Sequence, residues 1–165
     1  MIIRPYRGAS PVIGERVFLA ETAAVVGDVV LADDVSIWYG SVVRGDCCSI
    51  RIGARTNVQD NSTLHVTKDV GPLLLEEEVT LGHNCVVHAC TIRRGALVGM
   101  NATVLDGAEI GEKALVAAGS VALGVTVAVG VAVAWGLLVG CGVAVAGVAT
   151  TSTASSQKVS LCLTR

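Results

Sequence analysis

The sequence predicts an all-β chain folded as a left-handed parallel β-helix of hexapeptide repeats. Three observations lead to this: aliphatic residues recur every six positions, 52% of the residues are hydrophobic, and only 3% are aromatic. Val, Ile and Ala suit narrow, closely stacked β-structure better than the Leu- and Phe-filled core of an ordinary globule. The 165 residues are enough for one domain with a core of useful size.

The period of six predicts the strands. A helix repeats every 3.6 residues and a strand every two, so six fits a short strand plus a corner, three times per coil of about 18 residues. Coils of this kind pair their backbones at about 4.8 Å, as neighbouring strands do in any sheet. Accidental periodicity in a chain rich in Val and Gly is the alternative. The repeating pairs are Leu31-Ala32, Ile37-Trp38, Val43-Arg44, Ile52-Gly53, Val58-Gln59, Leu64-His65, Leu81-Gly82, Val87-His88, Ile92-Arg93, Val98-Gly99, Val104-Leu105, Ile110-Gly111 and Val116-Ala117.

Two interruptions break the six-residue period. Nine residues separate Val43 from Ile52, so three are extra there. Residues 66–79 lose the period and contain Gly71-Pro72 and the run Glu76–Glu78. Because Pro, Gly and clustered charge are typical of loops, residues 66–79 are predicted to form an extruded loop.

Counting residues per coil places the three histidines. If the loop adds five residues, Arg44, His65 and His88 stack on one edge, and Gln59 lies beside His83 on the preceding edge. His83 and His88 are then separated by roughly 15 Å of extended chain. Imidazole nitrogens that share one zinc ion each lie about 2.0–2.1 Å from it. One subunit therefore cannot readily bring both rings to the same ion.

A homotrimer resolves this conflict, because a neighbouring copy could supply His83 and create three identical sites. His65, His83 and His88 are the only histidines of the chain. Three neutral imidazoles are the ligand set of a catalytic zinc ion with one open position. The alternative is that each histidine is an ordinary corner residue.

The same stretches resemble the γ-class carbonic anhydrase-like family of hexapeptide-repeat proteins. The resemblance covers about residues 1–120 and is specific in its combination of motifs. The stretches that carry it are Arg44-Gly45-Asp46, Asn57-Val58-Gln59-Asp60-Asn61, Leu64-His65, Gly82-His83-Asn84-Cys85-Val86-Val87-His88 and Gly99-Met100-Asn101.

The resemblance implies an enzyme, a carbonic anhydrase-type lyase in which a zinc-bound hydroxide reversibly hydrates carbon dioxide to bicarbonate. It implies that His65, His83 and His88 bind the zinc at the subunit interface, with iron or cobalt as alternative metals. Two further implications concern polar residues: an interface ion pair between Arg44 and Asp46, and positioning of the hydroxide or bicarbonate by Gln59 and Asn57.

Two departures from the family pattern leave other functions open. Cys47 stands where the best-characterised branch has a glutamate, and the acidic proton-shuttle loop is shorter. Glu76–Glu78 could take its place, but a solvated run of charges is the favoured interpretation. Hydration activity could therefore be weak. A non-catalytic metal-binding trimeric scaffold is one alternative. A hexapeptide-repeat acyltransferase, with acyl-coenzyme A between subunits, is the other.

The last third of the chain carries no charge between Ala114 and Gln157. Three regions are therefore expected: a β-helix with the metal site at 1–120, Val/Gly hexads at 121–149 that extend it, and a polar tail at 150–165. An aberrant segment is an alternative for the hexads. A membrane span is less favoured, because no basic clusters flank the run.

Bulk properties set the remaining expectations. A net charge of −2 without a Lys/Arg run gives no reason to expect nucleic acid as a partner. The first residues lack an apolar stretch of signal-peptide length, so a cytoplasmic location is expected. Six cysteines without a C-x-x-C pair are expected to remain reduced thiols.

Overall fold

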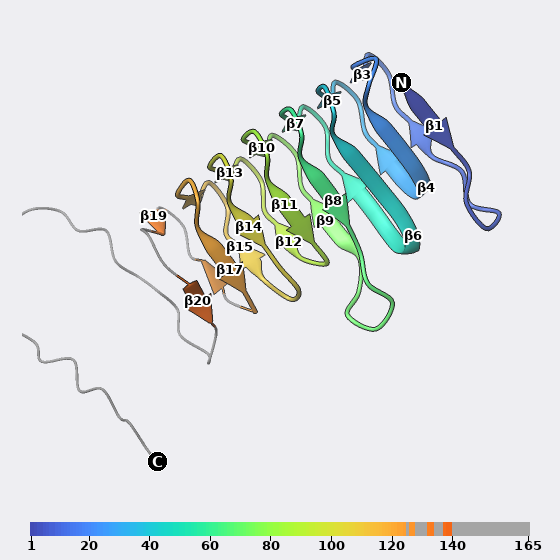
Figure 1. Cartoon of the computed structure of the whole chain (residues 1–165). Coiled ribbons are helices and arrows are strands. Elements are labelled where there is room, and N and C mark those ends of the chain that lie inside the picture. Colours follow the sequence, from blue (N-terminus) through green and yellow to red (C-terminus); the bar gives the residue numbers. More distant parts are fainter. Residues whose placement is uncertain (125, 128–131, 134–136, 140–165) are drawn as a thin grey trace, which may run out of the picture.

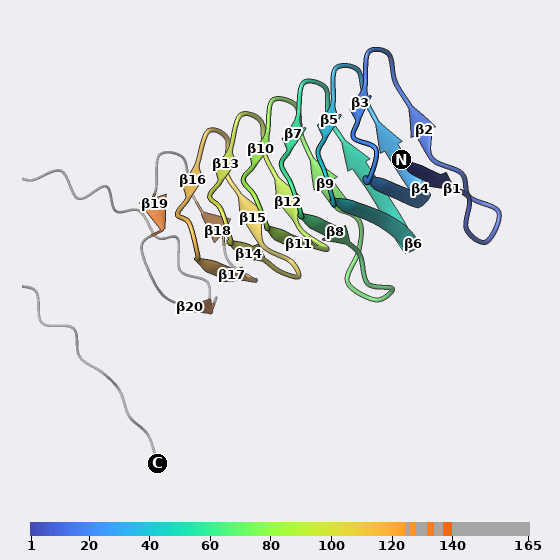
Figure 2. The same cartoon turned by 45° about the horizontal axis from the view of Figure 1, so that its top comes forward.

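The computed structural model describes residues 1–124, 126–127, 132–133 and 137–139, and within them every regular element is a β-strand. Each strand pairs in parallel with the strands one coil before and after it. Figure 1 shows the resulting column of coils, and Figure 2 shows the same column turned so that its faces separate. The predicted left-handed β-helix of hexapeptide repeats is confirmed.

Three faces build the column, and two long strands bend from the second face into the third. The first face contains β3 (Phe18–Leu19), β5 (Ser36–Ile37), β7 (Asn57–Val58), β10 (Thr80–Leu81), β13 (Leu97–Val98), β16 (Leu115–Val116) and β19 (Ala132–Val133). The second contains β1 (Ile2–Arg4), the first parts of β4 (Ala24–Leu31) and β6 (Val42–Ile52), then β8 (Thr63–His65), β11 (Val86–His88), β14 (Thr103–Val104), β17 (Val121–Leu123) and β20 (Leu137–Val139). The third contains β2 (Val12–Ile13), the second parts of β4 and β6, then β9 (Leu73–Leu75), β12 (Thr91–Ile92), β15 (Glu109–Ile110) and β18 (Thr126–Val127).

The core is a set of aliphatic ladders inside the column. On the second face Val43 pairs with Leu64, Leu64 with Val87, and Val87 with Val104, and all four side chains are fully buried. Each hexapeptide therefore sends its aliphatic residue inward, and burying such a side chain contributes about 1.5–3 kcal/mol. The stacking fixes the register of every coil on its neighbours.

The corners of the column carry residues whose backbone is left-handed, that is, residues with positive φ. At the corner between the third and first faces, Asp34, Arg55, Glu78 and Lys113 have φ values of 59°, 59°, 63° and 54°. Non-glycine residues pay about 1–2 kcal/mol for this conformation. The coil tolerates that cost because its backbone hydrogen bonds to the coils on both sides hold each corner in place.

The predicted loop is shorter than the sequence suggested. Residues 66–79 do not form one loop, because β9 lies within them and its Leu73 and Leu75 are fully buried in the third face. Of residues 66–79, only the segment between β8 and β9 projects from the column in Figures 1 and 2. The five additional residues shift the hexapeptide register. A strict count of six therefore does not place Leu73 and Leu75 at inward-facing positions.

The three extra residues between Val43 and Ile52 form a bulge. In the pairing of β4 with β6, Gly27 lies opposite Gly45 but Val29 lies opposite Ile50, so the bulge carries residues 46–49. Bulges commonly redirect side chains beside functional sites. This one turns Asp46 and Cys47 towards the edge that carries the histidines.

The strands β17 to β20 continue the pairing of the coils beyond residue 120. The expected boundaries at 120 and 149 stay predictions, and the polar tail at 150–165 lies outside the described residues. The described part of the chain contains no helix long and apolar enough to cross a membrane.

Candidate metal centre

Two histidines face each other on the edge between the second and third faces. Arg44 of β6 pairs with His65 of β8, and His65 pairs with His88 of β11, so the predicted stack is confirmed. Nδ1 of His65 lies 3.1 Å from Nε2 of His88, and the ring centroids are 5.1 Å apart. Both side chains are 23% exposed, which leaves the pair reachable at the edge of the column.

A carboxylate holds the opposite nitrogen of each ring. Nε2 of His65 lies 2.9 Å from Oδ1 of Asp46, and Nδ1 of His88 contacts Oδ1 of Asp106. Carboxylates in this position fix the tautomer and the orientation of metal-binding imidazoles and raise their basicity. The arrangement therefore directs Nδ1 of His65 and Nε2 of His88 towards each other as the nitrogens left to bind a metal.

The pair fits zinc. Two nitrogens bound to one tetrahedral zinc ion at about 2.0–2.1 Å lie about 3.3 Å apart, and the observed separation is 3.1 Å. Two ligands do not complete a zinc site, however. His65 and His88 are the only histidines that the described residues bring to this edge.

His83 lies on a different edge, at the turn between β10 and β11. Its Nδ1 is 2.9 Å from Oδ2 of Asp60, which leaves Nε2 for a metal, and the side chain is 50% exposed. Gln59 and His83 line the same open pocket of about 380 Å³, as the coil count predicted. The structure of one chain thus separates His83 from His65 and His88.

Asn57 lies on the first face and is held by two donors. Its Oδ1 accepts hydrogen bonds from Oγ of Ser36 at 2.9 Å and from Nε1 of Trp38 at 2.8 Å. These contacts fix the amide so that its NH₂ group points away from them. The structure does not bring Asn57 into the pocket with Gln59, and its role in positioning bicarbonate stays a prediction.

Electrostatics keep Asp46 ionised. Burial by itself would raise its pKa, but the hydrogen bond with His65 and the positive charge of Arg44 hold that pKa below the usual value. Nη1 of Arg44 lies 2.5 Å from Oδ2 of Asp46. The two residues therefore pair within one chain, and the interface role that the resemblance implies for them stays a prediction.

Sequence reasoning missed the carboxylates of Asp60 and Asp106 as partners of the histidines. The signal was present in the spacing. Asp106 follows His88 by 18 residues, one coil, and Asp60 precedes His83 by 23, one coil plus the five residues of the loop. A search for acids one coil away from each histidine would have found both.

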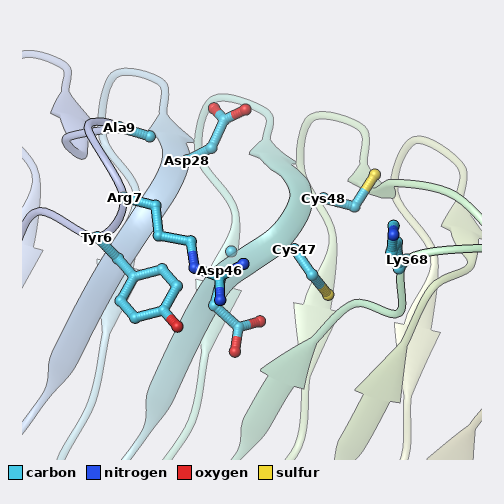
Figure 3. Close-up of a pocket in the computed structure, with 9 residues that line it drawn as sticks. Tyr6, Arg7, Ala9, Asp28, Asp46, Cys47, Cys48 and Lys68 are labelled. Carbon is cyan, nitrogen blue, oxygen red and sulfur yellow. The ribbon is translucent and has the colours of Figure 1, made fainter.

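The bulge also places two adjacent thiols. Figure 3 shows the sulfur of Cys47 on the same side as the Asp46 carboxylate, whereas the sulfur of Cys48 points the other way. The four described cysteines are free thiols, and the reduced state of all six stays a prediction. Burial raises the pKa of Cys85, and it raises that of Cys90 to about 12, so both are unreactive at neutral pH.

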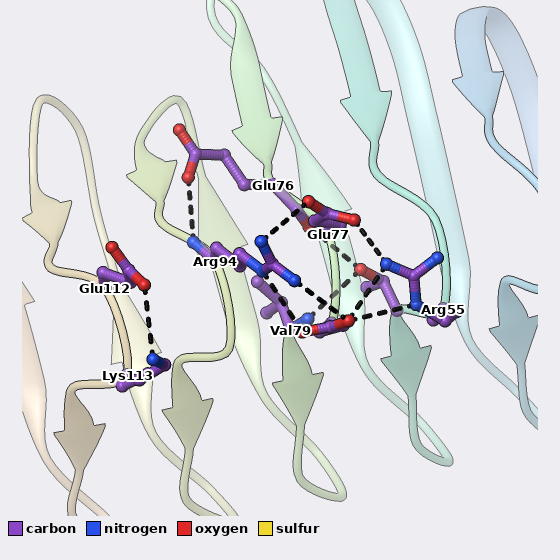
Figure 4. A network of polar contacts seen from close by, with 9 residues as sticks. Arg55, Glu76, Glu77, Val79, Arg94, Glu112 and Lys113 are labelled. Carbon is purple, nitrogen blue, oxygen red and sulfur yellow. Dashed lines mark hydrogen bonds and ion pairs between the residues drawn. The ribbon is translucent and has the colours of Figure 1, made fainter.

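The acidic run Glu76–Glu78 lies at the corner between the third and first faces, away from the histidines. Figure 4 shows it within a network of arginines from neighbouring coils. Arg93 contacts Glu76 at 2.8 Å, and Arg94 contacts Glu78 at 3.2 Å. Within one chain the run thus lies apart from the histidine pair, and a proton-shuttle role for it stays a prediction.

Comparisons with known proteins identify relatives of the chain. No family model matches the chain. It is 47% identical over 117 residues to "Gamma carbonic anhydrase 2, mitochondrial" of Arabidopsis thaliana, which is 68% of this chain and 42% of that protein. It is 44% identical over 111 residues to "Carbonic anhydrase" of Geobacillus kaustophilus, which is 67% of this chain and 60% of that protein. The chain thus spans about half the length of these two curated relatives.

A solved structure from Bacillus cereus, provisionally named an acetyltransferase, superposes with a TM-score of 0.79 at 42% identity and covers 82% of this chain and 78% of its own. Fold and repeats together define a hexapeptide-repeat β-helix protein. Within that class, the chain belongs to the γ-class carbonic anhydrase-like family.

Proposed function

We propose that this protein is a carbonic anhydrase-type lyase that reversibly hydrates carbon dioxide at a zinc site shared between subunits. The observation that carries the proposal is the His65–His88 pair, whose facing nitrogens are 3.1 Å apart while a carboxylate holds each outer nitrogen. Relatives named carbonic anhydrase support the same chemistry. Zinc is the metal we expect, with iron and cobalt as alternatives.

The remaining ligand is expected from a second copy of the chain. His83 is half exposed at an edge that its own His65 and His88 do not share. Large apolar side chains are exposed around that edge, including Val86, Leu97 and Met100. Clustered apolar exposure is typical of surfaces that bind other proteins. A homotrimer closed by rotation would create three equivalent sites.

The residues of the chain then have distinct tasks. A zinc ion supplies the Lewis acidity that lowers the pKa of water towards neutrality and makes it a nucleophile for carbon dioxide. Asp46 and Asp106 orient His65 and His88, and Asp60 orients His83. Gln59, beside His83, presents an amide that can orient the nucleophile without competing as a ligand. Arg44 and Asp46 add an ion pair next to the site.

Metal content, oligomer mass and stopped-flow hydration test the proposal on the full chain and on His83→Ala. We expect one zinc per subunit, a trimer, and hydration that the substitution abolishes. A trimer that binds zinc without hydration above background would instead indicate a metal-stabilised scaffold. A metal-free trimer would end the proposal.

An acyltransferase is the second candidate, and the solved structure from Bacillus cereus named provisionally as an acetyltransferase is the observation in its favour. It would require acyl-coenzyme A to bind between subunits and one histidine to act as a base rather than as a ligand. Direct titration with coenzyme A distinguishes the two, since binding is expected only for the acyltransferase. The cytoplasmic location stays a prediction.

A further inference from the structure

A second group of metal-binding side chains lies beside the histidine pair. The bulge in β6 places Asp46 and Cys47 next to each other, and His65 of β8 reaches Asp46 from the next coil. One ligand atom from each of the three residues lies within 4.8 Å of the others. Within the described residues, no other three His, Cys, Asp or Glu side chains come this close.

The contacts of the thiol show where it points. Sγ of Cys47 lies 3.2 Å from the carbonyl oxygen of Val66, and its side chain also interacts with the Asp46 carboxylate. Asp46 offers Oδ1 to His65 at 2.9 Å, while Oδ2 is held by Arg44. A carboxylate oxygen, a sulfur and an imidazole nitrogen therefore converge from one chain.

Space for a further ligand adjoins this group. A pocket of about 320 Å³ is lined by Asp46, Cys47 and Cys48, together with Tyr6, Arg7 and Lys68. The pocket is open to solvent, so water can reach a metal held there. Three protein ligands with one open position is a common zinc geometry, and sulfur with imidazole favours zinc and similar thiophilic cations.

We propose that Asp46, Cys47 and His65 form a second site for a divalent thiophilic cation, complete within one subunit. It takes Nε2 of His65, whereas the interface centre takes Nδ1, so one ring can serve either site. When the cation binds, the Cys47 thiol releases its proton to solvent and the thiolate bonds to the metal, while His65 gives up the Nε2 proton that faces Asp46 and carries its ring proton on Nδ1 instead. The site does not depend on the proposed hydration activity, because no neighbouring copy contributes a ligand.

Cobalt(II) is the probe that tests the site, since a thiolate bound to cobalt gives a charge-transfer band in the near ultraviolet and an all-imidazole centre does not. We expect the full-length apoprotein loaded with Co²⁺ alone to show this band. Cys47→Ser should abolish it. Cys48→Ser, a matched control whose sulfur points away, should leave it unchanged.

Further variants separate this site from the interface centre. The band should persist in His83→Ala and His88→Ala, which remove only interface ligands, and disappear in His65→Ala. A band absent from the wild type, or one that survives Cys47→Ser, would overturn the proposal whatever the hydration assay shows.

Alkylation provides a second readout, because saturating Zn²⁺ should protect Cys47 from iodoacetamide and leave Cys48 reactive. Equal reactivity of Cys47 with and without Zn²⁺ would also overturn it.

Discussion

A histidine becomes a useful metal ligand when something fixes which nitrogen it offers. In this chain each of the three histidines contacts an aspartate: His65 contacts Asp46, His83 contacts Asp60, and His88 contacts Asp106. Ordinary corner histidines would have no reason to share this pattern. The three contacts therefore support a metal-binding role more strongly than the histidine spacing alone.

Removing the carboxylate behind His88 should weaken metal binding. In Asp106→Ala the imidazole loses the contact that orients its Nε2 towards His65, and we expect zinc affinity to fall about 10- to 100-fold. Competition with a chromophoric chelator measures the affinity. Glu112→Ala removes the same charge from an exposed acid next to Lys113 and should have no effect. Equal affinity in wild type and Asp106→Ala would contradict the role given to Asp106.

Two glycines test how closely the coils approach. Gly27 has φ +81°, and a Cβ there would lie 2.2 Å from the carbonyl oxygen of Gly45. Gly119 has φ +72° but no atom within 4 Å of that position. Gly119→Ala should cost about 1–2 kcal/mol of unfolding free energy, the penalty of left-handed backbone alone. Gly27→Ala should cost more, because the bulge must also move; urea unfolding compares the two, and equal losses would refute the reasoning.

At the scale of elements, the corners between the third and first faces carry a ladder of alternating charge. Arg55 contacts Glu78, which contacts Arg94 of the following coil, and Arg93 bridges Glu76 and Glu109. Single exposed ion pairs contribute little, but networks with shared arginines contribute more. The ladder links successive coils at the corner between the third and first faces. It adds to the backbone pairing and core stacking that already join these coils.

The ladder should make the column sensitive to acid. Hydrogen bonds from Arg93 and Arg94 lower the pKa of Glu76 and Glu78, respectively. Their contribution to stability is thus present above the unfolded pKa of about 4.3 and is lost as pH falls through the lower folded values. Wild type should therefore lose more unfolding free energy between pH 6 and pH 3 than Glu76→Gln/Glu78→Gln, as urea unfolding would show. Identical losses would contradict the ladder's role.

The six-residue period predicted the strands wherever it was uninterrupted. The stack of Arg44, His65 and His88 follows from coil length alone, because each coil must pair with the next in register. The period failed at β9, where an insertion changed the phase although Leu73 and Leu75 still point inward. Register places Asp106 one coil from His88, so the spacing makes the contact possible, but the rotamers that form it do not follow from the period.

At the scale of the molecule, one chain does not bring together the three histidines of the proposed zinc site. The structure keeps His83 on its own edge with Asp60 and Gln59, while His65 and His88 face each other on another. Zinc requires three protein ligands within about 2.0–2.1 Å of one point. The proposed activity therefore depends on assembly, and the exposed apolar residues around His83 provide a surface for it.

Mixing two inactive variants tests this account most directly. His83→Ala keeps the His65–His88 pair and His88→Ala keeps His83, so a site that joins these two kinds of subunit in the right order is intact. If variants are unfolded and refolded together in equal amounts, about a quarter of the interfaces should be intact, with a matching share of the wild-type hydration rate. Each variant refolded alone should show no hydration above background. A mixture as inactive as its components would contradict a metal site built between subunits.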